Sequence, residues 1–191
     1  MRTKFFFTSL LLLASVSLFA QNDKAVKRYG FQSAIVQMTT DVMGQKVAST
    51  VYVDEYGAKE CQKTKIEVPG MGEVESALII KGNETWAVNY SLKSVQAAPL
   101  DQPNFVSLSD EMVKKYTIQE VGKEKVLEKD CTVYNMESEA QGMKAKIKVW
   151  VYKGFALKQE TEISGVKIVA QATEFNEGAM VLPQLFEVPS F

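Results

Sequence analysis

The residue types that most often perform acid–base or metal chemistry are scarce in this sequence. It contains no histidine, which removes the commonest general base and metal ligand and excludes Ser–His and Cys–His nucleophile pairs. Glu160 and Glu162 have the spacing of two carboxylates on one strand face, but glycosidase chemistry needs such groups to face each other across a sugar cleft. Lys146 and Lys144 are expected opposite them on the neighbouring strand, so cross-strand ion pairs explain them better. We predict a protein that is not an enzyme, with no catalytic residues, metal site or cofactor.

Apolar side chains of the predicted strands offer a different kind of site. They alternate with polar residues and would share one face of a sheet, where they could line a cavity for an acyl chain or simply form the core. The residues of this candidate ligand-binding face are Val36, Met38, Val51, Val53, Trp86, Val88, Val149 and Leu157.

Two aromatic residues, Trp150 and Tyr152, fall on the same strand face as a run of lysines. An aromatic pair among polar neighbours could be a contact patch for a protein partner. The alternative is that both rings shield an apolar edge or pack under a loop.

The two cysteines, Cys61 and Cys131, could form a disulfide in an oxidising compartment. Such a bridge would close a loop of about 70 residues and contribute roughly 4 kcal/mol in the chain-entropy model. The alternative is two separate buried thiols that act as small hydrophobes, and the sequence leaves both open.

The overall composition is that of an ordinary globular domain, with 46% hydrophobic and 24% charged residues. Lysines and arginines number 22 against 23 aspartates and glutamates, so no electrostatic footprint for nucleic acid is present. The composition does not change along the chain in a way that would indicate a second domain.

The N-terminus has the parts of a secretory signal peptide. Arg2 and Lys4 precede an uncharged apolar run that ends at the small residue Ala20. We therefore predict a signal peptide over residues 1–20 and a mature domain over residues 21–191. Because Gln21 stands where a lipoprotein would need cysteine, we expect a periplasmic or secreted protein that is soluble after cleavage and not lipid-anchored, with a monomeric state.

The hydrophobic period from Gly30 onward is two, which predicts antiparallel strands joined by tight turns. The dipeptide Gly44-Gln45 is expected to form a type II′ turn. That turn pairs Val42 with Val47 and Val36 with Val53, so the apolar faces of the two strands coincide.

Two further turns are predicted near the C-terminus. A three-residue loop over residues 152–154 would pair Val149 with Leu157 and set Lys146 opposite Glu160. The next dipeptide, Ser164-Gly165, is expected as a type I′ turn that pairs Ile163 with Val166.

A helix is predicted over residues 107–116, where Ser107 and Asp110 resemble a capping box. The fold class that follows is mainly β: a single highly curved antiparallel sheet of about ten strands, an unclosed half-barrel, with one or two short helices covering its concave face. A sandwich of two sheets is the alternative, since it also gives alternation with regular turns.

Three stretches resemble a family of small exported bacterial proteins of unknown function, which is related in fold to the outer-membrane lipoprotein carriers and receptors (LolA/LolB-like). They are residues 51–59, residues 149–158 and residues 182–189, with Ala156 standing where the pattern often has proline. The resemblance implies an unclosed antiparallel barrel around helices and binding of a lipid or acyl group on its concave face. It does not extend to lipoprotein trafficking, because that role depends on an arginine-controlled lid and the predicted lid here contains no arginine.

Two functions remain after this reading. The first is a non-enzymatic exported protein that binds a lipid or other apolar ligand in the half-barrel. The second is an envelope or extracellular protein-interaction or scaffold module, engaged through Trp150 and Tyr152 or an exposed edge strand, with no small-molecule ligand.

Overall fold

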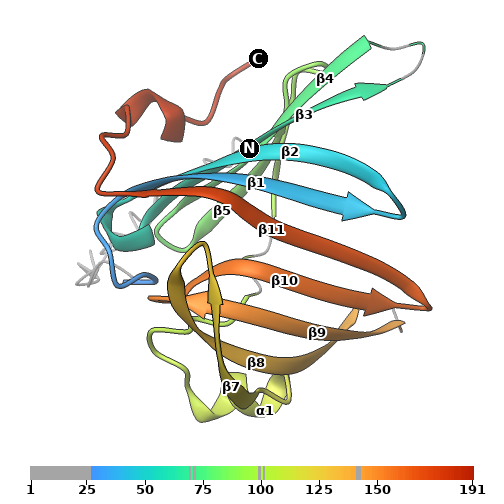
Figure 1. The fold of residues 1–191 in the computed structure, drawn as a ribbon. Helices are drawn as coiled ribbons and strands as arrows, with labels where there is room; N and C mark the ends of the chain where they lie inside the picture. Colours follow the sequence, from blue (N-terminus) through green and yellow to red (C-terminus); the bar gives the residue numbers. More distant parts are fainter. Residues whose placement is uncertain (1–26, 69, 71, 99, 101, 141–142) are drawn as a thin grey trace, which may run out of the picture.

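The computed structural model describes residues 27–191 except 69, 71, 99, 101, 141 and 142. The predicted signal peptide lies outside the described residues. In the described part, eleven strands form one antiparallel sheet in the order β6-β5-β4-β3-β2-β1-β11-β10-β9-β8-β7 (Figure 1). The strands are β1 (Ala34–Val42), β2 (Gln45–Asp54), β3 (Lys59–Val68), β4 (Gly72–Lys81), β5 (Glu84–Asn89), β6 (Ser94–Ala97), β7 (Gln119–Val126), β8 (Lys129–Ala140), β9 (Met143–Tyr152), β10 (Phe155–Ile163) and β11 (Val166–Glu177).

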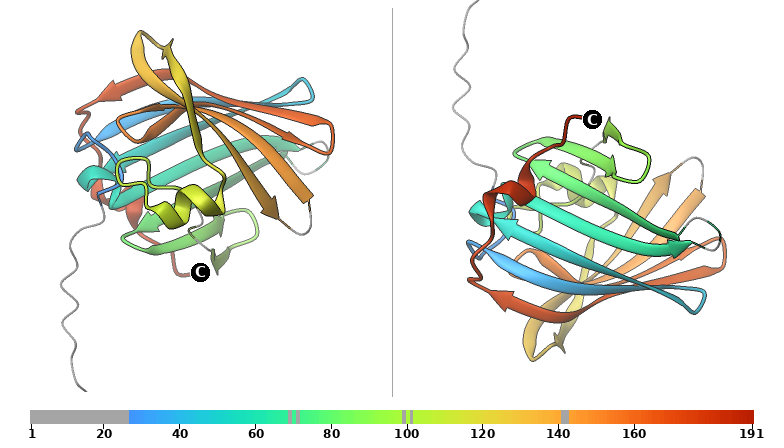
Figure 2. Two further views of the ribbon diagram at one scale, coloured as in Figure 1. Left: turned by 90° about the horizontal axis from the view of Figure 1, so that it is seen from below. Right: turned by 90° about the horizontal axis from the view of Figure 1, so that it is seen from above.

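The predicted fold class is confirmed. The sheet is strongly curved and does not close, because its edge strands β6 and β7 do not pair with each other (Figure 2). One sheet with this continuous order excludes the sandwich of two sheets, and the expected number of about ten strands is close to the eleven found.

The helical elements are short: η1 (Glu55–Gly57), α1 (Asp110–Lys115) and η2 (Pro183–Phe186). The predicted helix exists, but its N-cap is Ser109 rather than Ser107, and the Ser109 hydroxyl accepts a hydrogen bond from the Met112 amide at 3.2 Å. Asn104 explains the later start, because its backbone carbonyl and side-chain oxygen accept from the amides of Ser107 and Val106 and hold that stretch in a turn.

The first predicted hairpin has the right faces and the wrong turn. Met43 and Gly44 occupy the turn, both with positive φ, and β1 pairs Val42 with Gln45 and Val36 with Val51. The expected pairing of Val42 with Val47 is therefore wrong by two residues. A shift of two residues keeps every side chain on its face, which is why the apolar faces still coincide.

The β9–β10 hairpin corrects a second prediction. Its turn has two residues, Lys153 and Gly154, and pairs Phe155 with Tyr152. A β-bulge then falls between Ala156 and Lys158, so Glu160 lies opposite Lys148 instead of the expected Lys146. The extra residue in the bulge restores the face alternation that a two-residue turn would otherwise reverse. The Ser164-Gly165 turn, with Ile163 opposite Val166, is confirmed.

Three clusters of buried side chains stabilise the sheet. The central cluster gathers residues of the segment before β1 with residues of β1, β2, β8, β9, β10 and β11, among them Phe31, Val36, Val53, Phe155 and Leu157. The helix cluster joins α1 and its flanks to β8 and β9, and the tail cluster joins the chain after β11 to β3, β4 and β5. Figure 2 shows α1 across the open side of the curved sheet and the C-terminal segment against the opposite face, and we call these the inner and outer faces.

Gly154 is a position where backbone conformation and close packing both exclude a side chain. Its φ is +88°, and a Cβ would lie 2.5 Å from both the Arg28 carbonyl oxygen and the Val106 Cγ2. Gly165 has a similar φ of +80° with no atom within 4 Å of the same position. In urea unfolding, we expect Gly154→Ala to lower the free energy of unfolding by at least about 1 kcal/mol more than Gly165→Ala. Equal losses would show that only the backbone conformation matters.

Candidate functional site

A cavity of about 250 Å³ lies on the inner face of the sheet, and we call it the central cavity. Its apolar wall comes from strands far apart in the sequence, because β1, β2, β8, β9, β10 and β11 meet around the middle of the sheet. That wall consists of Met38, Val51, Met136, Val149, Phe155, Ala156 and Ala170. Residues 102–105 line the cavity as well, and we call this segment the strap.

The polar end of the central cavity is built around Arg28. Arg28 is 5% exposed, and both Nε and Nη2 donate to the Gly57 carbonyl oxygen, Nε at 2.7 Å. Glu60 Oε2 lies 3.5 Å from Arg28 Nη2 and accepts a 2.6 Å hydrogen bond from the Tyr29 hydroxyl. The remaining nitrogen, Nη1, is buried and has no hydrogen-bond partner. A buried ion pair with one unpaired donor costs folding free energy, and such groups in an apolar setting are typical of a functional site.

Burial dominates the electrostatics of this pair. It raises the pKa of Glu60 above its ordinary value, while the Arg28 charge and the Tyr29 hydrogen bond work in the opposite direction. Burial, followed by the Glu60 charge, also raises the pKa of Tyr29 well above 10.0. The Tyr29 hydroxyl therefore stays protonated and donates a hydrogen bond to Glu60.

The strap is fixed at the polar end and covered by the helix cluster at the other. Asn104 Nδ2 donates to the Lys27 carbonyl oxygen at 3.1 Å, next to Arg28. Phe105 packs with Tyr134, their ring centroids 5.2 Å apart, and belongs to the helix cluster with Leu108 and Met112. The expectation that the helical segment covers the concave face is therefore confirmed for the part of the sheet around β8 and β9.

A wider hollow continues the inner face toward the β6 edge, and we call it the inner hollow. It measures about 490 Å³ and is lined mainly by uncharged polar and small side chains, including Gln62, Thr64, Ser76, Asn89 and Gln96. Gln62 also lines the central cavity, so the two spaces are neighbours. The inner hollow therefore connects the middle of the sheet with the turn that carries Leu92.

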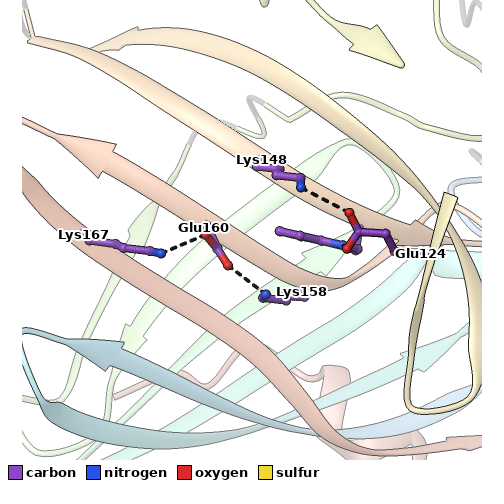
Figure 3. A network of polar contacts seen from close by, with 6 residues as sticks. Glu124, Lys148, Lys158, Glu160 and Lys167 are labelled. Atoms are coloured by element: carbon purple, nitrogen blue, oxygen red, sulfur yellow. Dashed lines mark hydrogen bonds and ion pairs between the residues drawn. The ribbon is translucent and has the colours of Figure 1, made fainter. Parts of the chain in front are cut away.

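A hollow of about 470 Å³ with a charged lining lies across the strands from β7 to β11. It contains three lysines (Lys146, Lys148 and Lys167) and three glutamates (Glu137, Glu160 and Glu162). In Figure 3, Glu160 lies between two of the neighbouring lysines, Lys158 at 2.8 Å and Lys167 at 2.9 Å, and these hydrogen bonds lower its pKa. Because the charges balance, this hollow does not favour an anion or a cation.

Trp150 lies beside this ion-pair network and is only 4% exposed. Its indole N–H donates to Glu124 at 2.8 Å, and the ammonium groups of Lys148 and Lys158 lie 4.7 Å and 4.2 Å from its ring centroid. Tyr152 is half-buried, with its ring against Phe175 and its hydroxyl donating to Glu177 at 3.1 Å. Neighbouring side chains thus cover the indole ring of Trp150, and binding of a partner through Trp150 and Tyr152 stays a prediction.

The residues predicted to bind a ligand are divided among the three clusters. Met38, Val51 and Val149 line the central cavity. Val36, Val53 and Leu157 are fully buried in the central cluster, whereas Trp86 and Val88 belong to the tail cluster with Phe186. Ligand binding stays a prediction for all eight, and the structure brings only the first three to an open space.

The two cysteines are free thiols in different clusters, Cys61 in the tail cluster and Cys131 in the central cluster. Burial raises the pKa of Cys61 to about 11 and raises that of Cys131 as well, which makes both thiols unreactive. The arrangement corresponds to the second of the two alternatives, separate buried thiols.

Sequence reasoning missed Arg28, Tyr29 and Glu60 as residues of the site. Glu60 lies at an inner-face position of β3, and its burial depends on the approach of residues 28–29, which are about 30 positions away. A usable signal was present, since Arg28 is the one arginine after the predicted signal peptide and precedes an aromatic residue.

Two structural features were not found among the described residues, 27–191 outside the gaps. Within that part of the chain, no three histidine, cysteine, aspartate or glutamate side chains gather in a way that could hold a metal ion. No helix there is both long and apolar enough to cross a membrane.

No protein-family model matches the sequence, and neither does any curated protein. Solved structures do resemble the fold. MucB matches at a TM-score of 0.53 with 14% identity over 87% of this chain, and MucB in complex with MucA(peri) at 0.50 with 14% identity over 83%. Lipoprotein LppX from Mycobacterium tuberculosis matches at 0.42 with 12% identity, over 80% of this chain and 90% of its own.

This chain spans 60% and 54% of the two MucB chains, so it corresponds to a little over half of that protein. At such identities the likeness shows the fold alone. The expected fold, an unclosed antiparallel barrel with a short helix across its open side, is confirmed.

Proposed function

We propose that this chain is an exported, non-enzymatic protein that binds an apolar ligand, such as an acyl chain, in the central cavity. The proposal includes cleavage after residue 20 and a soluble monomer over residues 21–191, without a lipid anchor or cofactor. The observation that carries it is the cavity itself, a space with an apolar wall in the middle of the sheet, whereas the two larger hollows are lined mainly by polar or charged side chains.

The lining of the central cavity is apolar along one wall and polar at one end, which indicates how a ligand would be oriented. The methionine, valine and phenylalanine side chains of the apolar wall can bury an aliphatic chain and supply about 25 cal/mol for each square ångström of apolar surface removed from water. At the polar end, Arg28 and Glu60 offer donors and acceptors for a polar group. A ligand with one apolar part and one polar end fits this division.

Protein interaction is the second candidate function. Both edge strands of the sheet, β6 and β7, have one side without a strand partner in the described part of the chain, and an extended peptide could add there as a further strand. MucB has been solved in complex with MucA(peri), which supports a protein partner as an alternative for this fold. On β7, however, charged residues and a bulge between Glu120 and Gly122 oppose strand addition, so we place ligand binding first.

The test is to purify the mature chain from the cell envelope without detergent and to analyse a solvent extract by mass spectrometry. We expect about one apolar molecule per chain, and Ala170→Phe, which fills the cavity wall, should remove it. The matched control is Ala48→Phe, because Ala48 is an exposed residue of β2. In a titration with the apolar fluorophore N-phenyl-1-naphthylamine, Ala48→Phe should bind like the wild type and Ala170→Phe should not bind. An empty wild-type extract together with no fluorophore binding would overturn the proposal.

A further inference from the structure

Hairpin turns gather at one end of the sheet. The β1–β2 and β10–β11 turns lie there together, because Val42 pairs with both Gln45 and Ile168. The start of β9 is close by, since Ala145 pairs with Ile163. The β5–β6 turn is on the same side of the sheet but set back from the other turns, because it follows Asn89, which pairs with Ser76 in the middle of β4. In Figure 1 the hairpins β1–β2, β3–β4 and β10–β11 all end on the right of the picture. We call this end the turn rim.

Large apolar side chains are exposed along the turn rim. Met43 is 80% exposed, Leu92 70% and Met143 48%, and they come from three separate hairpins. Val42 and Ile66, on strands that end at the same rim, add partly exposed apolar side chains. Isolated surface hydrophobics are ordinary, but three at the turns of separate hairpins on one side of the sheet are not explained by packing.

We propose that the turn rim docks onto a lipid bilayer, with Met43, Leu92 and Met143 entering its apolar layer. The side chains stand singly on separate tips and do not form a continuous patch. A protein partner would need such a patch with matching shape, whereas a fluid hydrocarbon layer accepts isolated apolar anchors without shape complementarity. Methionine and leucine at tips are therefore better suited to a bilayer than to a folded partner.

The charges of the turn rim agree with insertion as the main driving force. Lys46, Lys93 and Lys144 alternate with acidic residues such as Asp41 and Glu139, so the rim has no excess of positive charge. Lys65 is already held by Glu73 at 2.9 Å. Binding should therefore change little between vesicles of phosphatidylcholine alone and vesicles that contain phosphatidylglycerol.

The rim also leads to the proposed ligand site. Leu92 lines the inner hollow, and Gln62 lines both the inner hollow and the central cavity. A bilayer at the rim would therefore lie next to the inner hollow, which adjoins the central cavity at Gln62, and we place the exchange of an apolar ligand between membrane and cavity along this side. This step rests on the proposed function, whereas the docking itself does not.

The test measures sedimentation of the mature chain with vesicles of phosphatidylethanolamine and phosphatidylglycerol at 3:1. The triple variant Met43→Gln, Leu92→Gln and Met143→Gln is expected to bind at least tenfold more weakly than the wild type. The matched control is Met180→Gln with Leu182→Gln, because these side chains are 90% and 61% exposed but follow β11 at the opposite end of the sheet. All these positions are exposed, so the unfolding midpoint should be the same in the three proteins.

Three outcomes would overturn the docking proposal: a wild type that stays in the supernatant, a triple variant that binds as well as the wild type, and a control that loses binding equally. Loss of self-association in the triple variant without any vesicle binding would assign the rim to contacts between copies. Fluorophore binding to the central cavity should be unchanged in the triple variant. Vesicle sedimentation therefore tests the docking proposal and fluorophore binding tests the proposed function, and either can fail without the other.

Discussion

Replacing Arg28 with methionine is expected to lower the free energy of unfolding by about 3–5 kcal/mol, because the change leaves the Glu60 carboxylate buried without its countercharge. Methionine keeps much of the packing volume, so the loss reports the missing charge and the donors to Gly57. Urea unfolding at pH 7 measures it. An exposed ion pair gives the comparison: Lys59→Met removes the partner of Glu55 at the surface and should cost less than about 1 kcal/mol.

The double variant Arg28→Met with Glu60→Met separates charge from packing. If an unpaired carboxylate causes the loss, removing both charges should recover most of it, since well-packed apolar groups can replace a buried ion pair without cost. A double variant as unstable as the single one would assign the loss to the hydrogen bonds that hold Gly57.

The loss in Arg28→Met should depend on pH, with a definite sign. Burial raises the pKa of Glu60 in the folded protein, and the Arg28 charge is the larger of the two causes that oppose this rise, the other being the hydrogen bond from Tyr29. Without Arg28 the folded-state pKa rises further, so the protonated form contributes stability that is present below the unfolded pKa of about 4.3 and disappears as pH rises through the folded pKa. The stability deficit of the variant is therefore expected to be smaller at pH 4 than at pH 7.

The strand faces could be predicted from the sequence more securely than the strand pairings. Val36 and Val51 were expected on one inner face and lie there, because a period of two survives any register shift of two residues. The pairings depended on turn length, which is a weaker signal. Lys153-Gly154 and Met43-Gly44 both form two-residue turns, and the bulge after Ala156 compensates the first of them in a way that residue types alone do not specify.

The candidate site was harder to predict, because it depends on contacts between distant segments. Met38 and Val149 were recognised as apolar inner-face residues, and their strands lie on either side of β10 and β11 in the sheet. Arg28 was not, since a charged residue before the first strand is normally solvated. Its burial requires Gly57, which turns the chain with a φ of +87°, and the approach of Tyr29 to Glu60, neither of which has a local sequence signal.

Phe186→Ala is expected to release the C-terminal segment from the outer face of the sheet. Phe186 is 3% exposed in the tail cluster, where η2 packs on β3 and β4 and covers Cys61. Truncating a buried phenylalanine costs about 3–5 kcal/mol. If the free energy that holds the segment on the sheet falls by this amount, the fraction of molecules with the segment released rises at least a hundredfold. The measurement is alkylation of the thiols followed by mass spectrometry of the peptides, which locates the label.

Cys131 provides a control within the same molecule. In the intact protein both thiols should react slowly, because both are buried and both have raised pKa values, that of Cys61 at about 11. When the C-terminal segment leaves, Cys61 gains solvent and its pKa returns toward the ordinary value near 8.5, whereas Cys131 stays in the central cluster. Met180→Ala, in the same segment but 90% exposed, should change neither rate. Equal acceleration of both cysteines in Phe186→Ala would mean that the whole sheet unfolds when the segment is weakened, and that the segment is part of the core instead of a separable cover.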